Sequence, residues 1–257
     1  MTDTTTHTAL ITGASRGLGL ALASRLAKMR WNLIIDARGA DALNVTRTEL
    51  SHLTSVIAIP GDVTDPAHRQ ALVDAAIKMG GLDALVNNAS MLGPSPQPKL
   101  LEYPLDVLER VYRTNVIAPL ALIQTLQHQL KPGARIINIT SDAGVEAYEG
   151  WGGYGSSKAA LEQLSHILAA ENTGQDPRPP TALSAKGTEP PAGGHQLGPP
   201  NDRRGHRLVP RDQALADRRS SWGCCVCDCA CGYLDTRAAR DSHFARDPLD
   251  ISAPFRE

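Results

Sequence analysis

The chain has 257 residues and a formal net charge of −1 at pH 7. This length suits one domain with a full hydrophobic core, and a charge near zero argues against a nucleic acid or another polyanion as partner. No apolar stretch approaches the roughly 20 residues that a transmembrane helix needs. The first residues lack the basic and apolar segments of a secretory signal. We therefore expect a soluble cytoplasmic protein without a membrane or nucleic-acid partner.

The composition changes at about residue 175. Residues 1–175 read as an ordinary globular protein. In residues 176–257, arginine outnumbers lysine heavily, Pro-Pro pairs recur, and the isoleucines and valines are reduced to Val209, Val226 and Ile251. We therefore predict one globular domain over residues 1–175 and an atypical tail over residues 176–257.

Short apolar runs rich in β-branched residues alternate with longer helical patterns up to residue 171. In chain order, the predicted strands are Thr8–Thr12, Leu33–Asp36, Ser55–Ile59, Asp83–Asn87 and Arg135–Thr140. The predicted helices are Gly17–Met29, Pro66–Met79, Pro104–Leu130, with a bend expected at Pro119, and Tyr154–Glu171. Apolar strands between helices are typical of a parallel sheet covered on both faces. Right-handed crossovers then give a doubly wound, Rossmann-like α/β sheet.

Three glycines follow the first predicted strand, in Thr12-Gly13-Ala14-Ser15-Arg16-Gly17-Leu18-Gly19. Glycines permit a tight turn and let backbone N–H groups approach a pyrophosphate, while the N-terminus of the next helix adds a partial positive charge. Three glycines also occur as simple turn residues. Their position directly after a first strand favours dinucleotide binding.

The end of the second predicted strand bears on the choice between NAD and NADP. An acidic residue there binds the adenosine ribose of NAD, and a basic residue binds the 2′-phosphate of NADP. The sequence offers both, as Asp36 and Arg38. Arg38 and Arg16 are suited to bracket a phosphate. The alternative is that Asp36 and Arg38 are solvated charges at a strand end.

Tyr154 and Lys158 are four residues apart at the start of the last predicted helix. This spacing places both side chains on one face of a helix. A free tyrosine has a pKa of about 10, which is too high for a base near neutrality, and a nearby ammonium group favours the phenolate and lowers that pKa. The pair therefore indicates an acid/base site. The alternative is an aromatic residue and a cation at a helix start without a catalytic role.

Together these motifs resemble the short-chain dehydrogenases/reductases. The motifs are TGASRGLG, the NNA of residues 87–89, Ser141 after a buried strand, and Tyr154-x-x-x-Lys158, and the first is typical of the compact subfamily with a TGxxxGxG loop. The resemblance covers about residues 8–172. It implies an NAD(P)-dependent oxidoreductase that interconverts a carbonyl and an alcohol by hydride transfer. It also implies a small or medium organic substrate, no metal, and a homodimer or homotetramer.

The resemblance implies a cofactor role for three further groups of residues. In the first loop the cofactor contacts are Thr12, Gly13, Ser15, Arg16, Gly17, Leu18 and Gly19. Asp62 would bind the adenine amino group beside Val63, and Asn88 and Ala89 would line the cofactor. The family's discriminating acid falls at Ala37, followed by Arg38, so that Asp36 faces the other side of its strand. We therefore expect NADP, with NAD as the alternative.

The resemblance also implies the catalytic roles. Tyr154 would be the acid/base, and Lys158 would tune it and hold the nicotinamide ribose. Ser141 would donate a hydrogen bond to the substrate oxygen. Asn115 would bend the long helix and hold a water that links Lys158 to solvent. Ser90 departs from the family's usual NNAG, because it stands where that motif has glycine.

The tail leaves three alternatives open. It is a disordered Pro/Arg-rich extension, a metal site at Cys224–Cys231, or the product of a shifted reading frame from about residue 173. We favour the third hypothesis, because a GC-rich gene read out of frame loses isoleucine and valine and gains arginine and proline. Translation of the gene in its other two frames tests it, since a β-branched strand followed by Pro-Gly is expected there. No strand pattern is evident after Asn172, so we expect the sheet to end on its fifth strand. A nucleotide-binding protein without turnover is the alternative function.

Overall fold

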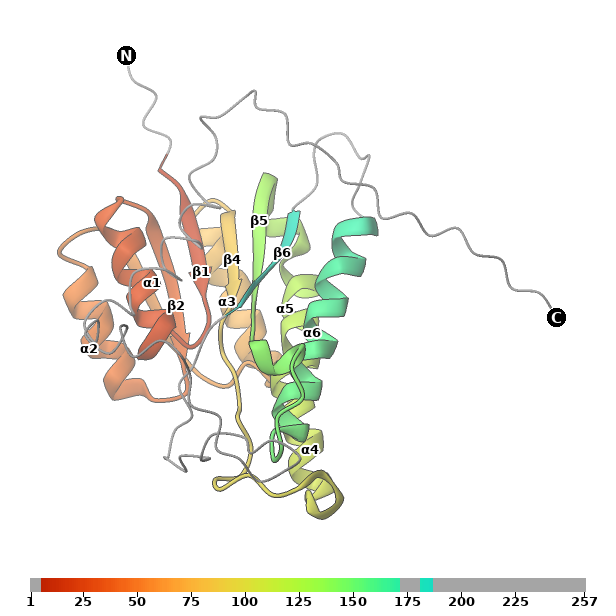
Figure 1. Cartoon of the computed structure of the whole chain (residues 1–257). Helices are drawn as coiled ribbons and strands as arrows, with labels where there is room; N and C mark the ends of the chain where they lie inside the picture. Colours follow the sequence, from red (N-terminus) through yellow and green to blue (C-terminus); the bar gives the residue numbers. More distant parts are fainter. Residues whose placement is uncertain (1–5, 172–180, 187–257) are drawn as a thin grey trace, which may run out of the picture.

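The computed structural model describes residues 6–171 and 181–186. These residues form a parallel sheet with the strand order β3-β2-β1-β4-β5-β6, flanked by helices on both faces (Figure 1). The strands are β1 (Thr8–Ile11), β2 (Asn32–Ala37), β3 (Val56–Pro60), β4 (Leu82–Asn87), β5 (Leu130–Thr140) and β6 (Thr181–Lys186). The α-helices are α1 (Gly17–Lys28), α2 (Ala40–Leu50), α3 (Pro66–Lys78), α4 (Leu105–Tyr112), α5 (Ala118–Leu126) and α6 (Gly152–Glu171). The predicted doubly wound α/β fold is confirmed.

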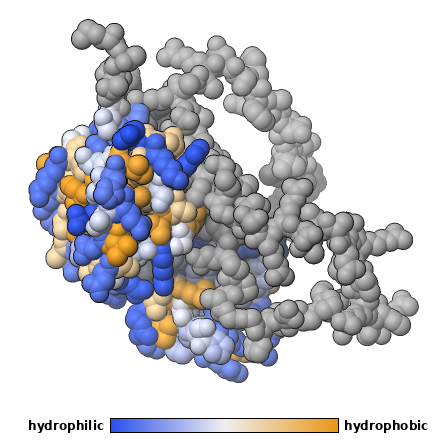
Figure 2. All heavy atoms as spheres, turned by 90° about the vertical axis from the view of Figure 1, so that its left-hand side faces the viewer, coloured by the Kyte–Doolittle hydropathy of each residue, from blue (hydrophilic) through white to orange (hydrophobic). Residues whose placement is uncertain are grey.

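The two faces of the sheet bury separate apolar clusters, because successive strand side chains point to opposite sides. Ala9 and Ile11 of β1 pack with residues of α1 and α2, whereas Leu10 packs with residues of α3 and α5. Figure 2 views the molecule from the side of α1 and α2, where hydrophobic residues are interspersed among hydrophilic ones. The strand order reverses between β1 and β4, and ligands of such sheets bind at the carboxyl ends of the strands near this point. The loops after β1 and β4 are therefore the expected ligand site.

Within the predicted helix Pro104–Leu130, α4 and α5 are separated by a π-helical segment. The helix ends earlier than predicted, because Gln127–Gln129 is a 3₁₀ turn and Leu130 begins β5. Arg113–Ile117 forms the π-helical segment between α4 and α5. The irregularity therefore precedes Pro119, which lies in the first turn of α5. Single π-helical turns inside α-helices are frequent at functional sites. The prediction that the chain departs from a regular helix near Asn115 agrees with this segment.

The prediction that the sheet ends on its fifth strand is wrong. β6 runs parallel to β5, in a register that pairs Arg135 with Thr181 and Thr140 with Lys186. Only Thr181 is β-branched in this strand, so side-chain propensity gives no signal for it. Strand pairing is made by backbone C=O groups, which every residue has, and by N–H groups, which every residue except proline has. The cysteine-rich run at 224–231 lies outside the described residues.

Among residues 6–171 and 181–186, no helix is long and apolar enough to cross a membrane. The same ranges hold no group of three metal-ligating side chains arranged to bind an ion.

Candidate functional site

The loops after β1 and β4 are tied together through Thr12. Its hydroxyl accepts hydrogen bonds from the backbone N–H groups of Asn88 and Ala89, at 3.0 and 2.9 Å. The Asn88 side chain in turn donates to the carbonyl oxygens of Thr12 and Gly13, at 2.8 and 3.1 Å. Asn88, which directly follows the neighbouring strand β4, therefore holds the turn of residues 12–19 in place; we call this segment the glycine turn.

Gly19 is required by a close approach of backbone to backbone. A Cβ atom at this position would lie 2.4 Å from the Gly13 carbonyl oxygen and 2.5 Å from Asn88 Nδ2. The start of α1 thus packs directly on the turn. Arg16, at the N-cap of α1, and Gly17 are both exposed, so the helix N-terminus and its partial positive charge face solvent.

The charged residues at the end of β2 have separate environments. Arg38 is exposed. Asp36 is buried, where its Oδ1 accepts from the Gly13 N–H at 2.8 Å and its Oδ2 lies 2.9 Å from His68 Nε2. The alternative of a solvated strand-end charge is therefore wrong for Asp36. An Asp36 so placed is not available to a ribose, which leaves Arg38 as the charged group at this strand end.

Asp62 follows β3 and is partly exposed. Its Oδ1 accepts from the backbone N–H and the hydroxyl of Thr64, each at 2.8 Å. Burial works to raise the pKa of Asp62, but these hydrogen bonds and the positive charge of Arg38 outweigh it and hold the pKa below its ordinary value. Asp62 is therefore an anionic acceptor at neutral pH, as the binding of an adenine amino group requires.

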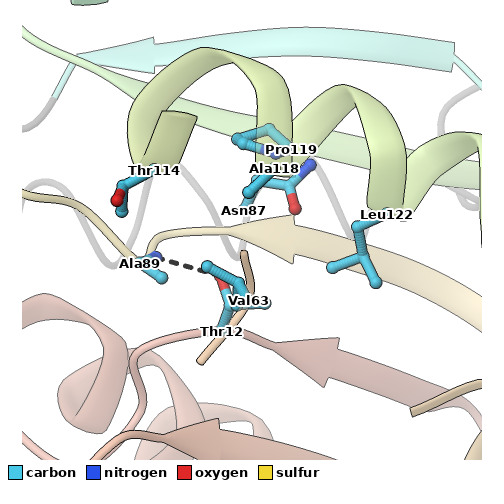
Figure 3. Close-up of a pocket in the computed structure, with 8 residues that line it drawn as sticks. All are labelled: Thr12, Val63, Asn87, Ala89, Thr114, Ala118, Pro119 and Leu122. Atoms are coloured by element: carbon cyan, nitrogen blue, oxygen red, sulfur yellow. Dashed lines mark hydrogen bonds between the residues drawn. The ribbon is translucent and has the colours of Figure 1, made fainter. Parts of the chain in front are cut away.

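A small pocket opens between the carboxyl ends of the central strands and the long helix (Figure 3). Its lining residues are Thr12, Val63, Asn87, Ala89, Thr114, Ala118, Pro119 and Leu122. Thr12, Val63 and Ala89 are among the predicted cofactor residues. The four helical residues were not predicted, although the spacing of 114, 118 and 122 is that of one helix face.

Tyr154 and Lys158 lie together on one face of α6. Their exposed fractions are 5% and 2%, and Lys158 Nζ lies 5.5 Å from the centre of the Tyr154 ring. The ammonium group also donates to the Ile139 carbonyl of β5 at 2.8 Å. Trp151 packs edge-on against Tyr154, with 5.9 Å between ring centres. A cation thus sits beside a buried phenol, as the i, i+4 spacing predicts.

Ser141 follows β5 directly and is 5% exposed. Its hydroxyl donates to Asp142 Oδ1 at 2.9 Å and accepts from the Ala143 N–H at 3.3 Å. The short 3₁₀ turn that it caps, Asp142–Gly144, packs against α6. A Cβ atom on Gly155 would lie 2.5 Å from the Ala143 carbonyl oxygen. The turn that follows Ser141 therefore packs against the first turn of α6, which contains Tyr154.

Asn115 lies in the π-helical segment and is 1% exposed. Its Oδ1 accepts from the Met91 N–H at 2.7 Å and the Ser90 hydroxyl at 3.2 Å. Its Nδ2 donates to the Met91 carbonyl at 2.9 Å and to Ser157 Oγ at 3.0 Å. Since these four bonds use the whole amide, the side chain holds the loop after β4 against α6. A water molecule bound near Asn115 would therefore contact the backbone of Asn115 and not its side-chain amide.

The family model for short chain dehydrogenases matches residues 7–176. The chain belongs to this family. A rhamnolipids biosynthesis 3-oxoacyl-[acyl-carrier-protein] reductase of Pseudomonas aeruginosa is 40% identical over 175 residues, which are 65% of this chain and 67% of the relative. A short chain dehydrogenase of Emericella nidulans is 36% identical over 64% of each chain. The family predicted from the sequence is confirmed.

Solved structures of family members agree with the fold. A short chain dehydrogenase from Burkholderia cenocepacia J2315 in complex with NADP has a TM-score of 0.64 and 32% sequence identity, over 70% of this chain and 73% of that one. The chain spans 67%, 64% and 63% of the lengths of the first three curated relatives.

Proposed function

We propose that this member of the family is an NADP-preferring oxidoreductase that interconverts a carbonyl and an alcohol on a small or medium organic substrate. The observation that carries the proposal is the buried Tyr154–Lys158 pair on α6, against which the turn after Ser141 packs. The reductase and dehydrogenase names of the relatives support it. So does the NADP in the Burkholderia structure.

The residues at the carboxyl ends of β1, β2 and β3 fit a dinucleotide. The glycine turn and the N-terminus of α1 suit a pyrophosphate. The anionic Asp62 and the neighbouring Val63 suit an adenine. Arg38 is exposed directly after β2, the strand end that meets the adenosine ribose in such folds, and a guanidinium suits a 2′-phosphate because it forms two parallel hydrogen bonds with such a group.

The bound nicotinamide would supply the hydride. In carbonyl reduction, the Tyr154 hydroxyl gives a proton to the substrate oxygen, and in alcohol oxidation the phenolate takes it back. Lys158 stabilises the phenolate by its charge. The Ser141 hydroxyl, now donated to Asp142 Oδ1, turns to donate to the substrate oxygen as negative charge develops there. Asn115 keeps the loop after β4 and α6 in register around this site.

Replacing Arg38 by alanine is expected to raise the KM for NADPH by about tenfold to a hundredfold and to leave the KM for NADH within about twofold. The loss corresponds to one charge-assisted contact of about 1.5–3 kcal/mol. Steady-state kinetics with each cofactor measures it. Arg110→Ala is the matched control, because Arg110 is an exposed arginine paired with Asp106 on α4. Equal losses with NADPH and NADH would contradict the assignment of Arg38 to a 2′-phosphate.

Gly19→Ala is expected to weaken NADPH binding by at least about tenfold. The added Cβ would displace Gly13 or Asn88, since it has only 2.4 Å to the Gly13 carbonyl oxygen, and backbone yields less readily than a flexible side chain. Titration of NADPH fluorescence measures the affinity. Gly39→Ala is the control, because its Cβ would meet open space. Unchanged affinity in Gly19→Ala would show that the turn does not hold the cofactor.

Turnover is tested by NADPH oxidation on a panel of aldehydes, ketones and 3-oxoacyl thioesters. Consumption of NADPH with formation of the matching alcohol is the expected result. Binding of NADPH without oxidation on any member of the panel would instead support a nucleotide-binding protein without turnover.

We further propose assembly as a homodimer or homotetramer through the long helices. Leu105 and Ile117 in the α4–α5 region and Ile167 on α6 are exposed apolar residues, and such residues are favourable at subunit interfaces. Sedimentation of the full chain tests the proposal, for which a monomer at micromolar concentration would be the contrary outcome.

A further inference from the structure

Asp36 and His68 form a buried pair beneath the glycine turn that the proposed mechanism does not use. Their exposed fractions are 1% and 7%, and His68 Nε2 lies 2.9 Å from Asp36 Oδ2. The two residues are 32 positions apart, on β2 and α3. A buried carboxylate is costly unless it is paired and hydrogen-bonded, so the pair calls for an explanation.

Asp36 fixes the first two amides of the turn. Its carboxylate accepts from the Gly13 N–H, and its own carbonyl accepts from the Ala14 N–H, each at 2.8 Å. Gly13 has a φ of 66°, so the chain turns at the residue whose N–H donates to the Asp36 carboxylate. Asp36 thus sets the path of the backbone that leads into α1.

His68 contacts both Asp36 and the loop after β3. A Cβ atom on Gly61 would lie 2.1 Å from His68 Nδ1, so the imidazole lies directly against the Gly61 backbone. The next residue is Asp62, which is assigned to the adenine. The pair therefore lies between the glycine turn and the loop after β3, with hydrogen bonds to the turn and a packing contact to the loop.

Burial raises the pKa of Asp36, against the opposing effect of the bonds from His68 and Gly13, and Asp62 adds a like charge nearby. The charges of Arg38 and His68 lower the pKa of Asp62. Loss of the His68 donor would leave Asp36 buried beside Asp62 without its side-chain partner, which favours release or reorientation of the carboxyl group that holds Gly13.

We propose that Asp36 is a positioning residue that shapes the glycine turn for the cofactor pyrophosphate, and that His68 holds Asp36 in place. This inference rests on the proposed function, because it concerns the same cofactor. It differs from the sequence-based alternative, in which Asp36 would bind a ribose, since Asp36 acts on the cofactor only through the backbone of Gly13 and Ala14.

The experiment compares a probe that contains the pyrophosphate with one that lacks it. The dissociation constant of NADPH is measured by fluorescence, and that of 2′-AMP by competition with NADPH. Asp36→Ala is expected to weaken NADPH by about tenfold or more and 2′-AMP by less than about twofold, with kcat at saturating NADPH within about threefold. Asp36→Asn retains an acceptor for the Gly13 N–H and is expected to bind NADPH within about threefold of the unchanged protein.

His68 is tested by a double-mutant cycle. His68→Leu is expected to weaken NADPH by about tenfold in the unchanged protein but by less than about threefold in the Asp36→Asn background, where no carboxylate is left unpaired. His68→Gln, which keeps a donor, is expected to stay within about threefold. The cycle also serves if Asp36→Ala does not fold.

Asp83→Ala is the matched control. Asp83 accepts from the Thr8 N–H at 2.9 Å and lies 3.1 Å from His7 Nδ1, at the opposite end of the sheet. Its replacement is expected to lower stability but to leave both dissociation constants unchanged. Equal weakening of NADPH and 2′-AMP in Asp36→Ala, or an Asp83→Ala effect of the same size, would overturn the inference.

The two proposals fail in different ways. If the unchanged protein neither binds nor oxidises NADPH, the proposed function fails and this inference falls with it. If the unchanged protein turns over and the Asp36 and His68 variants bind NADPH equally well, only this inference fails.

Discussion

Replacing Tyr154 by phenylalanine is expected to lower the rate of carbonyl reduction by about a thousandfold, with NADPH affinity within about twofold of the unchanged protein. Proton transfer by a positioned side chain contributes roughly 10²–10⁴ to a rate, and the substitution removes only the hydroxyl that transfers the proton. The ring remains, so its packing against Trp151 is kept. Stopped-flow measurement of NADPH oxidation at saturating carbonyl substrate gives the rate of the chemical step.

Tyr112→Phe is the control for this substitution, because it removes a phenol from α4 at a position to which no role in the site is assigned. It is expected to leave the rate unchanged. Full activity in Tyr154→Phe would exclude Tyr154 as the proton donor, and a parallel loss in both variants would point to a general effect of removing a phenol.

The fold was predictable from the sequence where strands are buried on both faces. Leu33, Ile34 and Ile35 of β2 are fully buried, so their apolar run is visible without any alternation. α2 was not predicted, because only Leu43, Thr46 and Leu50 of its residues are buried and the apolar stripe is thin. β6 was missed for a different reason. It pairs with β5 through backbone groups, whereas strand propensity describes the side chains.

The candidate site was predictable where its parts are close in sequence. The glycine turn and the Tyr154–Lys158 spacing are local patterns, and each reflects the geometry of one helix end. The bonds of Asn115 to Met91 and Ser157 join residues 24 and 42 positions apart, and no local pattern encodes them. Their only sequence signal is an asparagine inside a helix.

Asp36 shows the limit of reading a strand end by charge alone. The sequence offers an acid and a base two residues apart, and it does not show that the acid is buried at the end of β2 while the base is exposed beyond it. His68, which covers Asp36, lies on another helix. The burial of Asp36 therefore depends on a tertiary contact that no local sequence pattern encodes.

Lys158→Met is expected to lower alcohol oxidation at neutral pH by about a hundredfold and to recover much of that loss as the pH rises. Unit charges about 5 Å apart interact by about 3 kcal/mol at an effective dielectric constant of about 20, and each 1.4 kcal/mol is a factor of ten. Methionine keeps most of the apolar stem of a side chain that is 2% exposed, while it removes the ammonium group 5.5 Å from the Tyr154 ring. Without that cation the phenolate forms only at higher pH.

The pH dependence of oxidation separates this electrostatic role from a structural one. The midpoint of the rise in rate is expected to move up by about two pH units in Lys158→Met, whereas a damaged fold lowers the rate equally at every pH. Lys131→Met is the matched control, since Lys131 lies 2.8 Å from Asp83 at the other end of the sheet. A Lys158→Met profile that is lower but not displaced would mean that the ammonium group only holds Ile139 or the cofactor, and that Tyr154 reaches its anionic form without its help.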